Sequence, residues 1–386
     1  MNVVNLKLKN FRNYQSAEVN FSRGINLISG LNGQGKTNLV EAIVVASRTK
    51  SPRTHNDKDM IFSGADGAQA HLVVNKNEGD VLIDFYINKT EEKSFVINNN
   101  PVSRVGQVFG NLVCVYFSPQ ELKIVSGAPS DRRDFLDDDI SMLSESYYNL
   151  CLRYEKVLAQ RNKLLKTERD PAKIIDTIGV WDEQLASIAA AIVKTRKSFV
   201  SKLSPMANKF LNDLSANKED LKLSYVGVKG ESRDEIKKNL LRALDEGLSR
   251  DMELGYTGVG PHRDDLKIEL NGADARVFSS QGQSRSIALA LKLAEMKIME
   301  EELGEKPVVI LDDVFSELDT RRQRKLFEAV EDAQAIFTGT SFKFKPKDTK
   351  FGQLKVKNGT VAEGEKKKVK SEKCRRNASS LGGQPY

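Results

Sequence analysis

Residues 30–37 read Gly30-Leu31-Asn32-Gly33-Gln34-Gly35-Lys36-Thr37 and match the phosphate-binding pattern G-x-x-x-x-G-K-[ST]. An apolar, strand-like run precedes this loop, and a helix is expected over Asn38–Ala46. Glycines let consecutive N–H groups surround phosphate oxygens, and the helix start adds its positive dipole end. Lys36 supplies a charge to the outer phosphates, and the Thr37 hydroxyl can bind Mg²⁺. We therefore predict that residues 30–37, together with Asn38, bind a nucleoside triphosphate.

A second segment, Val308-Val309-Ile310-Leu311-Asp312-Asp313, supplies two carboxylates. Four consecutive apolar residues are typical of a strand buried on both faces of a parallel sheet. Asp312 follows at the carboxyl end of this strand, where ligands bind in such sheets, and can hold Mg²⁺ directly or through water. Asp313 is placed to polarise an attacking water. We therefore predict Thr37 and Asp312 as metal residues, and Lys36, Asp312 and Asp313 as catalytic residues.

The third segment, Ser279-Ser280-Gln281-Gly282-Gln283-Ser284, precedes a helix expected over 283–302. A serine hydroxyl and the free N–H groups of a helix start form an anion site, although serine is also a routine helix cap. Because the segment lies between the phosphate loop and the two aspartates in the expected order, we favour the anion site. The segment resembles the signature motif of ABC-type ATPases, with Gln281 in place of the usual glycine.

This resemblance implies that the signature acts on a second copy of the chain. In ABC-type ATPases it binds the γ-phosphate of ATP held by the other protomer, so Ser280, Gly282 and Gln283 are expected to act in trans. The segment Ser316-Glu317-Leu318-Asp319 resembles the D-loop of the same class, which lies along the dimer interface. Asp313 stands where most members have Glu, and its side chain is one methylene shorter, so we expect slow hydrolysis.

Other segments narrow the resemblance. Lys9-Asn10-Phe11-Arg12-Asn13-Tyr14 before the phosphate loop resembles the chromosome-maintenance and recombination branch of the ABC ATPases. Within that branch the RecF family is indicated by the signature and by two further segments. These are Ser118-Pro119-Gln120-Glu121-Leu122 with the following Gly127-x-Pro129-x-x-Arg132-Arg133-x-Phe135-Leu136-Asp137, and Gly260-Pro261-His262-Arg263-Asp264-Asp265. The likeness runs from residue 1 to about residue 363.

The family resemblance implies an α/β fold, with an ABC-type ATPase head that has a P-loop and a mixed sheet flanked by helices, plus a short helical arm. It implies ATP and Mg²⁺ as cofactors, an ATP-dependent homodimer, and binding to DNA at gaps and at single-stranded/double-stranded junctions. The implied partner proteins are RecO and RecR, and the implied task is to help load the RecA recombinase in repair and replication restart. Arg12 is expected near the nucleotide. Gln120, in the place of the Q-loop, is a candidate contact for Mg²⁺ or water.

The arm prediction rests on two helical runs at seven-residue spacing. One begins at Tyr147 and is broken by Arg161, the other begins at Ile178 and is broken by Thr195, and Pro171 lies between them. The runs fit either an antiparallel two-helix hairpin or the plain packing of a helical domain, and both remain open.

We expect four regions along the chain. They are a head lobe over 1–129, a helical arm over 130–252, a second head lobe over 253–363 and a basic disordered tail over 364–386. Strands are expected over 221–230 and 265–278. From Ser341 onward there are thirteen Lys or Arg residues against four acidic ones, so this end carries +9 and residues 1–340 carry −2 of the net +7. The basic end can recruit nucleic acid, or can serve only as a solvated tail.

Composition excludes several classes of protein. There is no apolar run long enough to cross a bilayer and no signal-peptide pattern, so we expect a cytoplasmic, nucleoid-associated protein without a membrane partner. Three scattered cysteines and three histidines form neither a disulfide framework nor a zinc pattern.

The alternatives kept open are an ATPase subunit of a transporter, a chromosome-organising head and an ATP-gated scaffold that does not hydrolyse ATP. For His262, a structural role is favoured over a phosphate contact.

Overall fold

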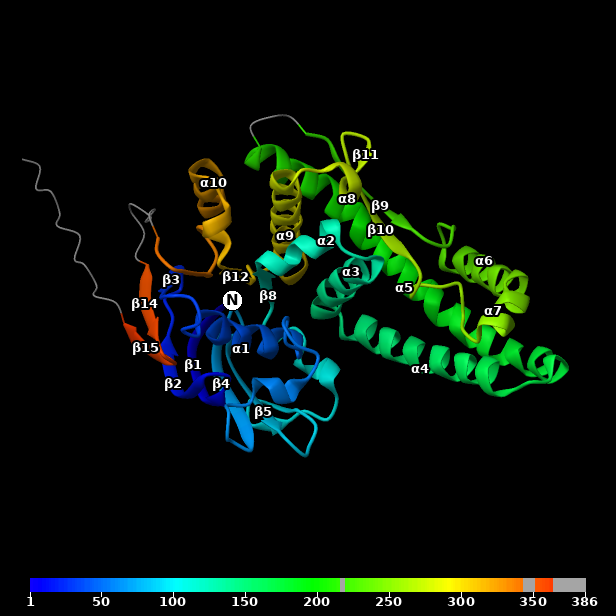
Figure 1. Ribbon diagram of the computed structural model, residues 1–386, viewed down its shortest axis with the longest axis horizontal. Coiled ribbons are helices and arrows are strands. Elements are labelled where there is room, and N and C mark those ends of the chain that lie inside the picture. The colour runs from blue at the N-terminus through cyan, green and yellow to red at the C-terminus, as the bar shows by residue number, and fades with distance from the viewer. Residues whose placement is uncertain (216–218, 343–350, 364–386) are drawn as a thin grey trace, which may run out of the picture.

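The computed structural model describes residues 1–215, 219–342 and 351–363, except for the side chains of residues 316 and 317 (Figure 1). The expected basic tail over 364–386 lies outside this part of the chain. In Figure 1 the chain forms a broad head and a narrower helical arm, which extends to the right.

The head is built on a mixed six-stranded sheet, as predicted. In spatial order its strands are β15 (Thr360–Glu363), β14 (Gly352–Lys357), β3 (Ile25–Ser29), β13 (Ala335–Gly339), β12 (Val308–Asp312) and β8 (Cys114–Phe117). The neighbours from β14 to β8 pair in parallel, and β15 pairs with β14 in antiparallel fashion. The strand that ends in Asp312 is thus separated from the strand that leads into the phosphate loop by β13 alone.

Alternate residues of this sheet enter two different cores. Val309 and Leu311 face one core, while Val308 and Ile310 face the other. Helix α9 (Gln281–Leu303) and helix α10 (Thr320–Val330) cover the first face. Helix α1 (Lys36–Arg48) covers the second face and separates the mixed sheet from an antiparallel sheet. That second sheet contains β2 (Tyr14–Asn20), β1 (Asn2–Phe11), β4 (Gly67–Lys76), β5 (Gly79–Asn88), β6 (Ser94–Ile97) and β7 (Asn100–Pro101).

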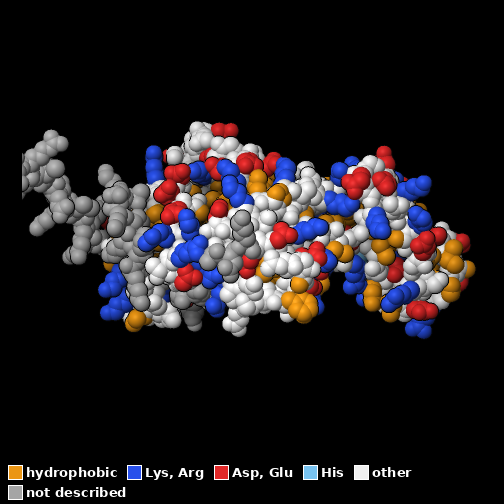
Figure 2. Space-filling view, turned by 90° about the horizontal axis from the view of Figure 1, so that it is seen from above, with side chains coloured by type: hydrophobic (Ala, Val, Ile, Leu, Met, Phe, Trp, Pro, Cys, Tyr) orange, Lys and Arg blue, Asp and Glu red, His pale blue; other side chains and the backbone are white. Residues whose placement is uncertain are grey.

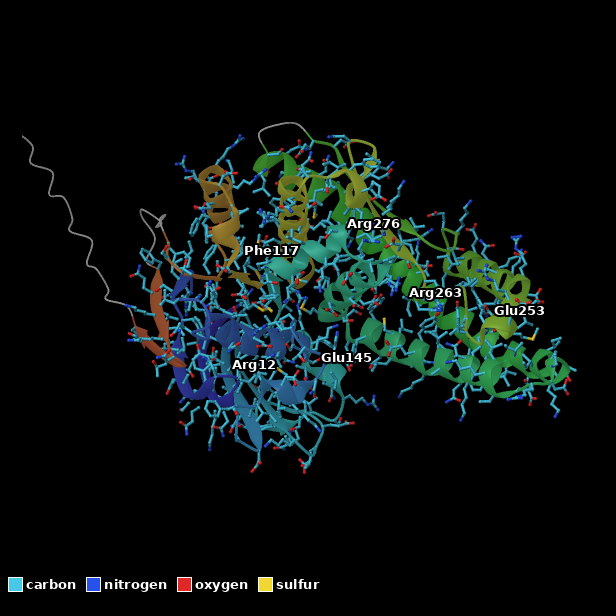
Figure 3. The ribbon with its side chains drawn as sticks, viewed as in Figure 1. Arg12, Phe117, Glu145, Glu253, Arg263 and Arg276 are labelled. Carbon is cyan, nitrogen blue, oxygen red and sulfur yellow. The ribbon has the colours of Figure 1, made fainter. Side chains whose placement is uncertain are left out.

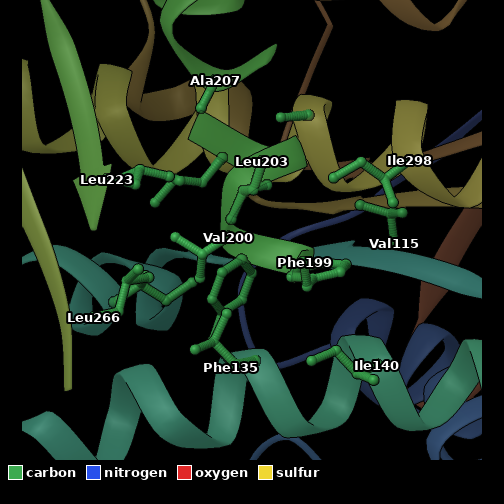
Figure 4. Close-up of a cluster of buried hydrophobic side chains, with 14 of the residues drawn as sticks. Val115, Phe135, Ile140, Phe199, Val200, Leu203, Ala207, Leu223, Leu266 and Ile298 are labelled. Carbon is green, nitrogen blue, oxygen red and sulfur yellow. The ribbon is translucent and has the colours of Figure 1, made fainter. Parts of the chain in front are cut away.

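The arm consists of helices that extend away from the sheets. They are α3 (Pro129–Leu143), α4 (Glu145–Thr167), α5 (Pro171–Leu214), α6 (Arg233–Glu246) and α7 (Leu248–Leu254). The first part of α5 lies along α4 as a hairpin, whereas its last part enters the core of the head, where Leu203 and Ala207 pack near Val115 and Ile298 (Figure 4). Both interpretations of the helical runs therefore apply, each to a different half of α5.

Arg161 explains one interruption of the seven-residue spacing. Its side chain is fully buried, and its guanidinium donates to Asp182 at 2.6 Å, to Asp251 at 2.7 Å and to Thr257 at 2.9 Å. A buried charge persists only when it is paired and hydrogen-bonded, and these partners meet that need. The charged residue thus joins α4 to α5 and α7 within the seam.

A third sheet corrects two strand predictions. Its strands are β9 (Leu221–Val226), β10 (Asp265–Leu270) and β11 (Ala273–Asp274). The strand expected over 221–230 ends at Val226, and the strand expected over 265–278 ends early because Asn271 and Gly272 form a turn with positive φ. Asp274 then caps a short helix, α8 (Ala275–Phe278), by accepting from the Arg276 N–H at 2.9 Å.

The expected region boundaries at 129 and 252 stay a prediction, although β9 pairs with β10 across the second of them. Short helical turns complete the fold, namely η1 (Asp57–Met60), η2 (Val105–Val108), η3 (Pro119–Leu122), α2 (Lys123–Ser126) and η4 (Val314–Glu317). Among the described residues, no helix is both long and apolar enough to cross a membrane.

Candidate nucleotide-binding site

The phosphate loop connects β3 to α1, and its glycines are required by positive φ angles or by close contacts. Gly33 and Gly35 have φ of +78° and +114°, which L side chains rarely adopt. A Cβ at Gly35 would lie 2.6 Å from Asn13 Nδ2, and one at Gly30 would lie 2.4 Å from the Val356 carbonyl oxygen. The loop is therefore fixed by packing before any ligand binds.

Two turns hold the loop from opposite sides. Asn13 Nδ2 donates to the Gln34 carbonyl at 3.0 Å, and the Tyr14 hydroxyl donates to the Gly35 carbonyl at 2.9 Å. On the other side, the Asn358 N–H donates to Gln34 Oε1 at 2.7 Å. The segment that carried the family resemblance, 9–14, thus supports the loop. No sequence pattern predicts the individual contacts of Asn13 and Tyr14 with this loop.

The loop borders a cavity of about 300 Å³. Its lining residues are Asn32, Gly33, Gly35, Lys36, Thr37, Asn38, Arg53 and Asp313. The Lys36 ammonium donates to the carbonyls of Gly30 at 2.9 Å and Leu31 at 3.0 Å. Burial lowers the pKa of Lys36, and the nearby Asp313 and Asp312 oppose this shift. The ammonium is thus placed beside a cavity large enough for phosphate groups.

Asp312 is buried at the end of β12 and accepts three hydrogen bonds. Thr37 Oγ1 donates at 3.0 Å, Thr338 Oγ1 at 2.5 Å and the Tyr116 hydroxyl at 3.2 Å. Burial raises the pKa of Asp312, and these hydrogen bonds counteract it. A hydroxyl and a carboxylate in contact are the hard oxygen ligands that Mg²⁺ prefers, and a divalent cation would stabilise the ionised carboxylate. The residues present therefore fit Mg²⁺, which would neutralise phosphate charge there.

Asp313 lies between two cavities. It lines the phosphate cavity and also a second cavity of about 520 Å³, which the candidate D-loop residue Asp319 lines as well. Asp319 caps α10 by accepting from the Arg322 N–H at 2.9 Å, and this hydrogen bond lowers the pKa of Asp319. Leu318 of the candidate D-loop lines the same second cavity, while the side chains of Ser316 and Glu317 are outside the described part of the structure. Asp313 and Asp319 thus share one continuous region of the surface.

The signature segment caps helix α9. Ser280 Oγ accepts from the Gln283 N–H at 3.2 Å, and Gln283 Oε1 accepts from the Ser280 N–H at 2.9 Å. Gly282 has open space where a Cβ would stand, since the nearest atom is 4.0 Å away. Helix α9 begins beside α8, well separated from α1 in Figure 1. Within one chain, the predicted trans residues therefore lie outside the phosphate cavity.

Two further predicted site residues, Arg12 and Gln120, do not line the phosphate cavity. The Arg12 guanidinium donates to both carboxylate oxygens of Glu41, at 2.9 and 2.6 Å, and to the Asp59 carbonyl at 2.7 Å. Arg12 is thus directed at Glu41 and not at the phosphate cavity. Gln120 lies exposed on η3.

Arg53 is a cavity residue that the sequence analysis missed. It donates to Asn38 Oδ1 at 2.6 Å and to Glu41 Oε2 at 3.4 Å, so Glu41 joins it to Arg12. Arg53 follows α1 in an irregular loop, where no periodic pattern marks a binding residue. Its only sequence signal is a basic side chain shortly after the phosphate-loop helix.

The two segments 127–137 and 260–265 meet at what we call the arm–head junction. Arg132 donates to both carboxylate oxygens of Asp265, at 2.7 and 2.9 Å, and Arg133 donates to the Asp264 carbonyl at 2.9 Å. Arg196 of α5 donates to both carboxylate oxygens of Asp137 and to the Pro261 carbonyl at 2.7 Å. These pairs join α3, α5 and the segment that leads into β10.

His262 belongs to the same junction. One ring nitrogen contacts the Tyr154 hydroxyl at 2.6 Å and the other contacts the Thr257 carbonyl at 3.0 Å. Burial lowers the pKa of His262, which favours the neutral ring. Both nitrogens are engaged, so the contacts favour the structural role. Arg263 lies over the Tyr256 ring at 4.9 Å, and Figure 3 shows it within the arm, near α5.

The fold and site together define an ABC-type nucleotide-binding head. Residues 2–359 match the family model described as the RecF/RecN/SMC N-terminal domain. The chain is 40% identical over 356 residues to the DNA replication and repair protein RecF of Alkaliphilus oremlandii, with 90% of this chain and 97% of that relative covered. It is 38% identical over 368 residues to RecF of Clostridium acetobutylicum, with 94% and 100% covered. The chain belongs to the RecF family.

Solved structures agree with this assignment. A structure described as the recombination mediator protein RecF with ATP in the RecFOR pathway superimposes with a TM-score of 0.88 and is 35% identical, covering 94% of this chain and 97% of that one. The Smc head domain of Pyrococcus furiosus, at 19% identity and a TM-score of 0.55, shares the fold alone.

Proposed function

We propose that this protein is an ATP-dependent DNA-binding recombination mediator that dimerises when it binds ATP. The observation that carries the proposal is the separation of the two halves of its nucleotide site. Lys36, Thr37 and Asp312 converge on one cavity, whereas Ser280 caps a helix outside it. A second copy of the chain would supply Ser280 to the outer phosphate. The similarity to RecF solved with ATP supports the choice of nucleotide.

Each residue has a role in this proposal. Lys36 and Thr37 hold the phosphates and Mg²⁺ in the same protomer, with Asp312 as the metal residue. The Thr37 lone pairs are available to the metal while its proton remains donated to Asp312. Asp313 orients the attacking water, and its short side chain makes hydrolysis slow. Hydrolysis removes the γ-phosphate contact to the partner's signature and so releases the dimer.

DNA is the proposed substrate of the closed dimer. The RecFOR pathway named for the similar structure supports RecO and RecR as partners. Gapped or junction DNA as the binding site, and assistance to RecA as the outcome, are what the family resemblance implies. In this proposal residues 1–129 and 253–363 form the head and 130–252 the arm, and the protein acts in the cytoplasm on the nucleoid. An ATP-gated scaffold without hydrolysis remains the second candidate, because Asp313 replaces the longer glutamate.

Solution mass tests the dimer. Light scattering of the protein without nucleotide, with MgATP, and with MgATP for Ser280→Arg should show doubling only for the unsubstituted protein with ATP. Ser201→Arg on α5 is a matched control, because it places the same charge on an exposed serine remote from the cavity. If mass stays constant with ATP and also with added gapped DNA, the dimer is wrong. Phosphate release with and without gapped DNA separates the ATPase from the scaffold.

Cross-linking tests the arrangement within the dimer. Leu31 in the phosphate loop and Phe278 just before the signature are 74% and 72% exposed. On the face shown in Figure 2, hydrophobic side chains lie in small groups between charged ones. A mixture of Leu31→Cys and Phe278→Cys chains, treated with a short bismaleimide, should give cross-linked dimers only with MgATP. Either variant alone should give few, because two copies of one site lie apart. Equal yields without ATP would contradict the trans arrangement.

A further inference from the structure

One buried hydroxyl connects the two aspartates of the site. Thr338 lies on β13 directly opposite Asp312 of β12, and its side chain is fully buried. Its Oγ1 donates to Asp312 Oδ1 at 2.5 Å and accepts from the Asp313 N–H at 3.0 Å. A hydroxyl can donate and accept at once, which neither an apolar nor an acidic side chain of this size does. Thr338 therefore touches both residues through a single atom.

The backbone of Asp313 needs such a partner. Its φ is +56°, in the left-handed region that few residues other than glycine adopt. The Asp313 N–H is shared between Thr338 Oγ1 and the Thr338 carbonyl, which accepts at 3.2 Å. These contacts fix the chain where it leaves β12, and so they fix the direction in which the Asp313 side chain enters its two cavities.

We propose that Thr338 is a positioning residue that couples the metal residue Asp312 to the water-orienting residue Asp313. The inference rests on the proposed ATPase activity. Asp312 is also held by Thr37 and Tyr116, but Thr338 joins it to Asp313. Movement of Asp312 when Mg²⁺ binds is thereby transmitted to the residue that orients water.

The test compares Thr338→Val, which has the same shape without the hydroxyl, with Thr338→Ser, which keeps it. Tyr116→Phe removes a different hydrogen bond to Asp312. Thr195→Val on α5, whose hydroxyl donates to the Ala191 carbonyl at 2.9 Å, is the remote control. Each variant is measured for binding of a fluorescent ATP analogue during a Mg²⁺ titration, for single-turnover cleavage of ATP and for thermal unfolding.

The Thr338→Val protein should cleave ATP about 10- to 100-fold more slowly at saturating Mg²⁺, because it lacks a hydrogen bond to a charged group. It should also raise the Mg²⁺ concentration for half-maximal analogue binding several-fold. Thr338→Ser should restore both quantities. Tyr116→Phe should raise the Mg²⁺ requirement but slow cleavage less than Thr338→Val, because Asp313 stays held. Thr195→Val should change neither quantity.

Three results would overturn the inference. They are a Thr338→Val protein with unchanged cleavage and Mg²⁺ dependence, a Thr338→Ser protein as impaired as Thr338→Val, and a loss explained fully by lower thermal stability. If Thr338→Val does not fold, Thr338→Ala takes its place against Thr338→Ser. If the unsubstituted protein cleaves no ATP, the proposed ATPase activity fails, and the Mg²⁺ titration alone decides whether Thr338 holds Asp312.

Discussion

In the nucleotide cavity the Lys36 ammonium is held by the main-chain carbonyls of Gly30 and Leu31, whereas at the arm–head junction the buried Arg196 guanidinium has a carboxylate and further oxygen partners of its own. Carbonyl contacts to a lysine are readily exchanged for phosphate oxygens. A two-pronged contact between arginine and a carboxylate is both stronger and geometrically specific. Lys36 can thus exchange its carbonyl partners for phosphate oxygens, whereas the contacts of Arg196 are suited to a permanent structural role.

The same comparison distinguishes two kinds of segment among those that carry the family resemblance: one that borders a cavity and two that contact each other. Residues of the phosphate loop line one side of a cavity of about 300 Å³, while segments 127–137 and 260–265 contact each other. A recognisable segment therefore need not be a ligand site. Four substitutions can break or sharpen this contrast.

The largest effect is expected for Arg196→Met at the junction. It leaves Asp137, whose side chain is 30% exposed, without the buried Arg196 guanidinium. Breaking a fully buried ion pair lowers the free energy of unfolding by about 3–5 kcal/mol, so we expect a decrease near the lower end, about 3 kcal/mol. The folded protein should bind the ATP analogue as before, because no cavity residue changes. Urea unfolding and analogue binding measure the two quantities. A loss of affinity without a loss of stability would contradict the division between the regions.

For Lys36→Met we expect the reverse, a loss of ATP affinity with little change in stability. The loss of charge-assisted contacts to phosphate should weaken ATP binding about 100-fold. Stability should change little, because the substitution removes a buried charge whose partners are carbonyl oxygens. Isothermal titration with MgATP and thermal unfolding test this, with Lys297→Met as a surface control. Marked unfolding of Lys36→Met alone would show that the lysine is structural.

A pH effect is expected for Asp264→Asn. Burial raises the pKa of Asp264 to about 6, while the Tyr225 hydroxyl and Arg196 pull the pKa down. Between about pH 4 and pH 6 the unfolded chain loses this proton before the folded one, so the contribution of Asp264 to stability falls as pH rises. Compared with the unsubstituted protein, Asp264→Asn should therefore gain about 2 kcal/mol between pH 4 and pH 7.

Urea unfolding of both proteins at pH 4, 5, 6 and 7 measures this difference. Asn can still accept from the Tyr225 hydroxyl, which donates at 2.6 Å, so the junction itself should persist. A constant difference across the whole pH range would show that Asp264 does not titrate there.

The smallest effect is expected for Tyr256→Leu. This change removes the contact of the Arg263 guanidinium with the Tyr256 ring, and such contacts at partly exposed positions contribute about 0.5–1 kcal/mol. Thermal unfolding should show a slight decrease, and ATP binding should be unchanged. A decrease as large as that of Arg196→Met would place the centre of the junction at Arg263.

Local patterns in the sequence predicted much of this molecule. The phosphate loop, the strand before Asp312 and the helix after Ser280 each lie in one continuous segment. A motif marks the loop, and the pattern of apolar residues marks the strand and the helix. The strand expected over 265–278 is shorter in the structure. The turn at Asn271 and the helix cap at Asp274 end it, although the alternating pattern continues. The predicted roles of Ser280 and Asp313 stay predictions.

Other site residues are brought together only by the fold. Asn13 and Tyr14 reach the loop because β1 and β2 form a hairpin beside it, and Thr338 reaches Asp312 through the pairing of β12 with β13. Tyr116 arrives from β8 in the same way. Such contacts span long separations in the chain, and spacing within one sequence does not record them.

Helix α5 has 44 residues, so at 1.5 Å per residue it measures about 65 Å. One part of it packs against α9, the helix that Ser280 caps, and the other part forms the arm with α4 (Figure 1). Such a helix is a lever, and each degree of tilt at one end displaces the other by about 1 Å. A change at the signature that tilts α5 would therefore also displace the tip of the arm.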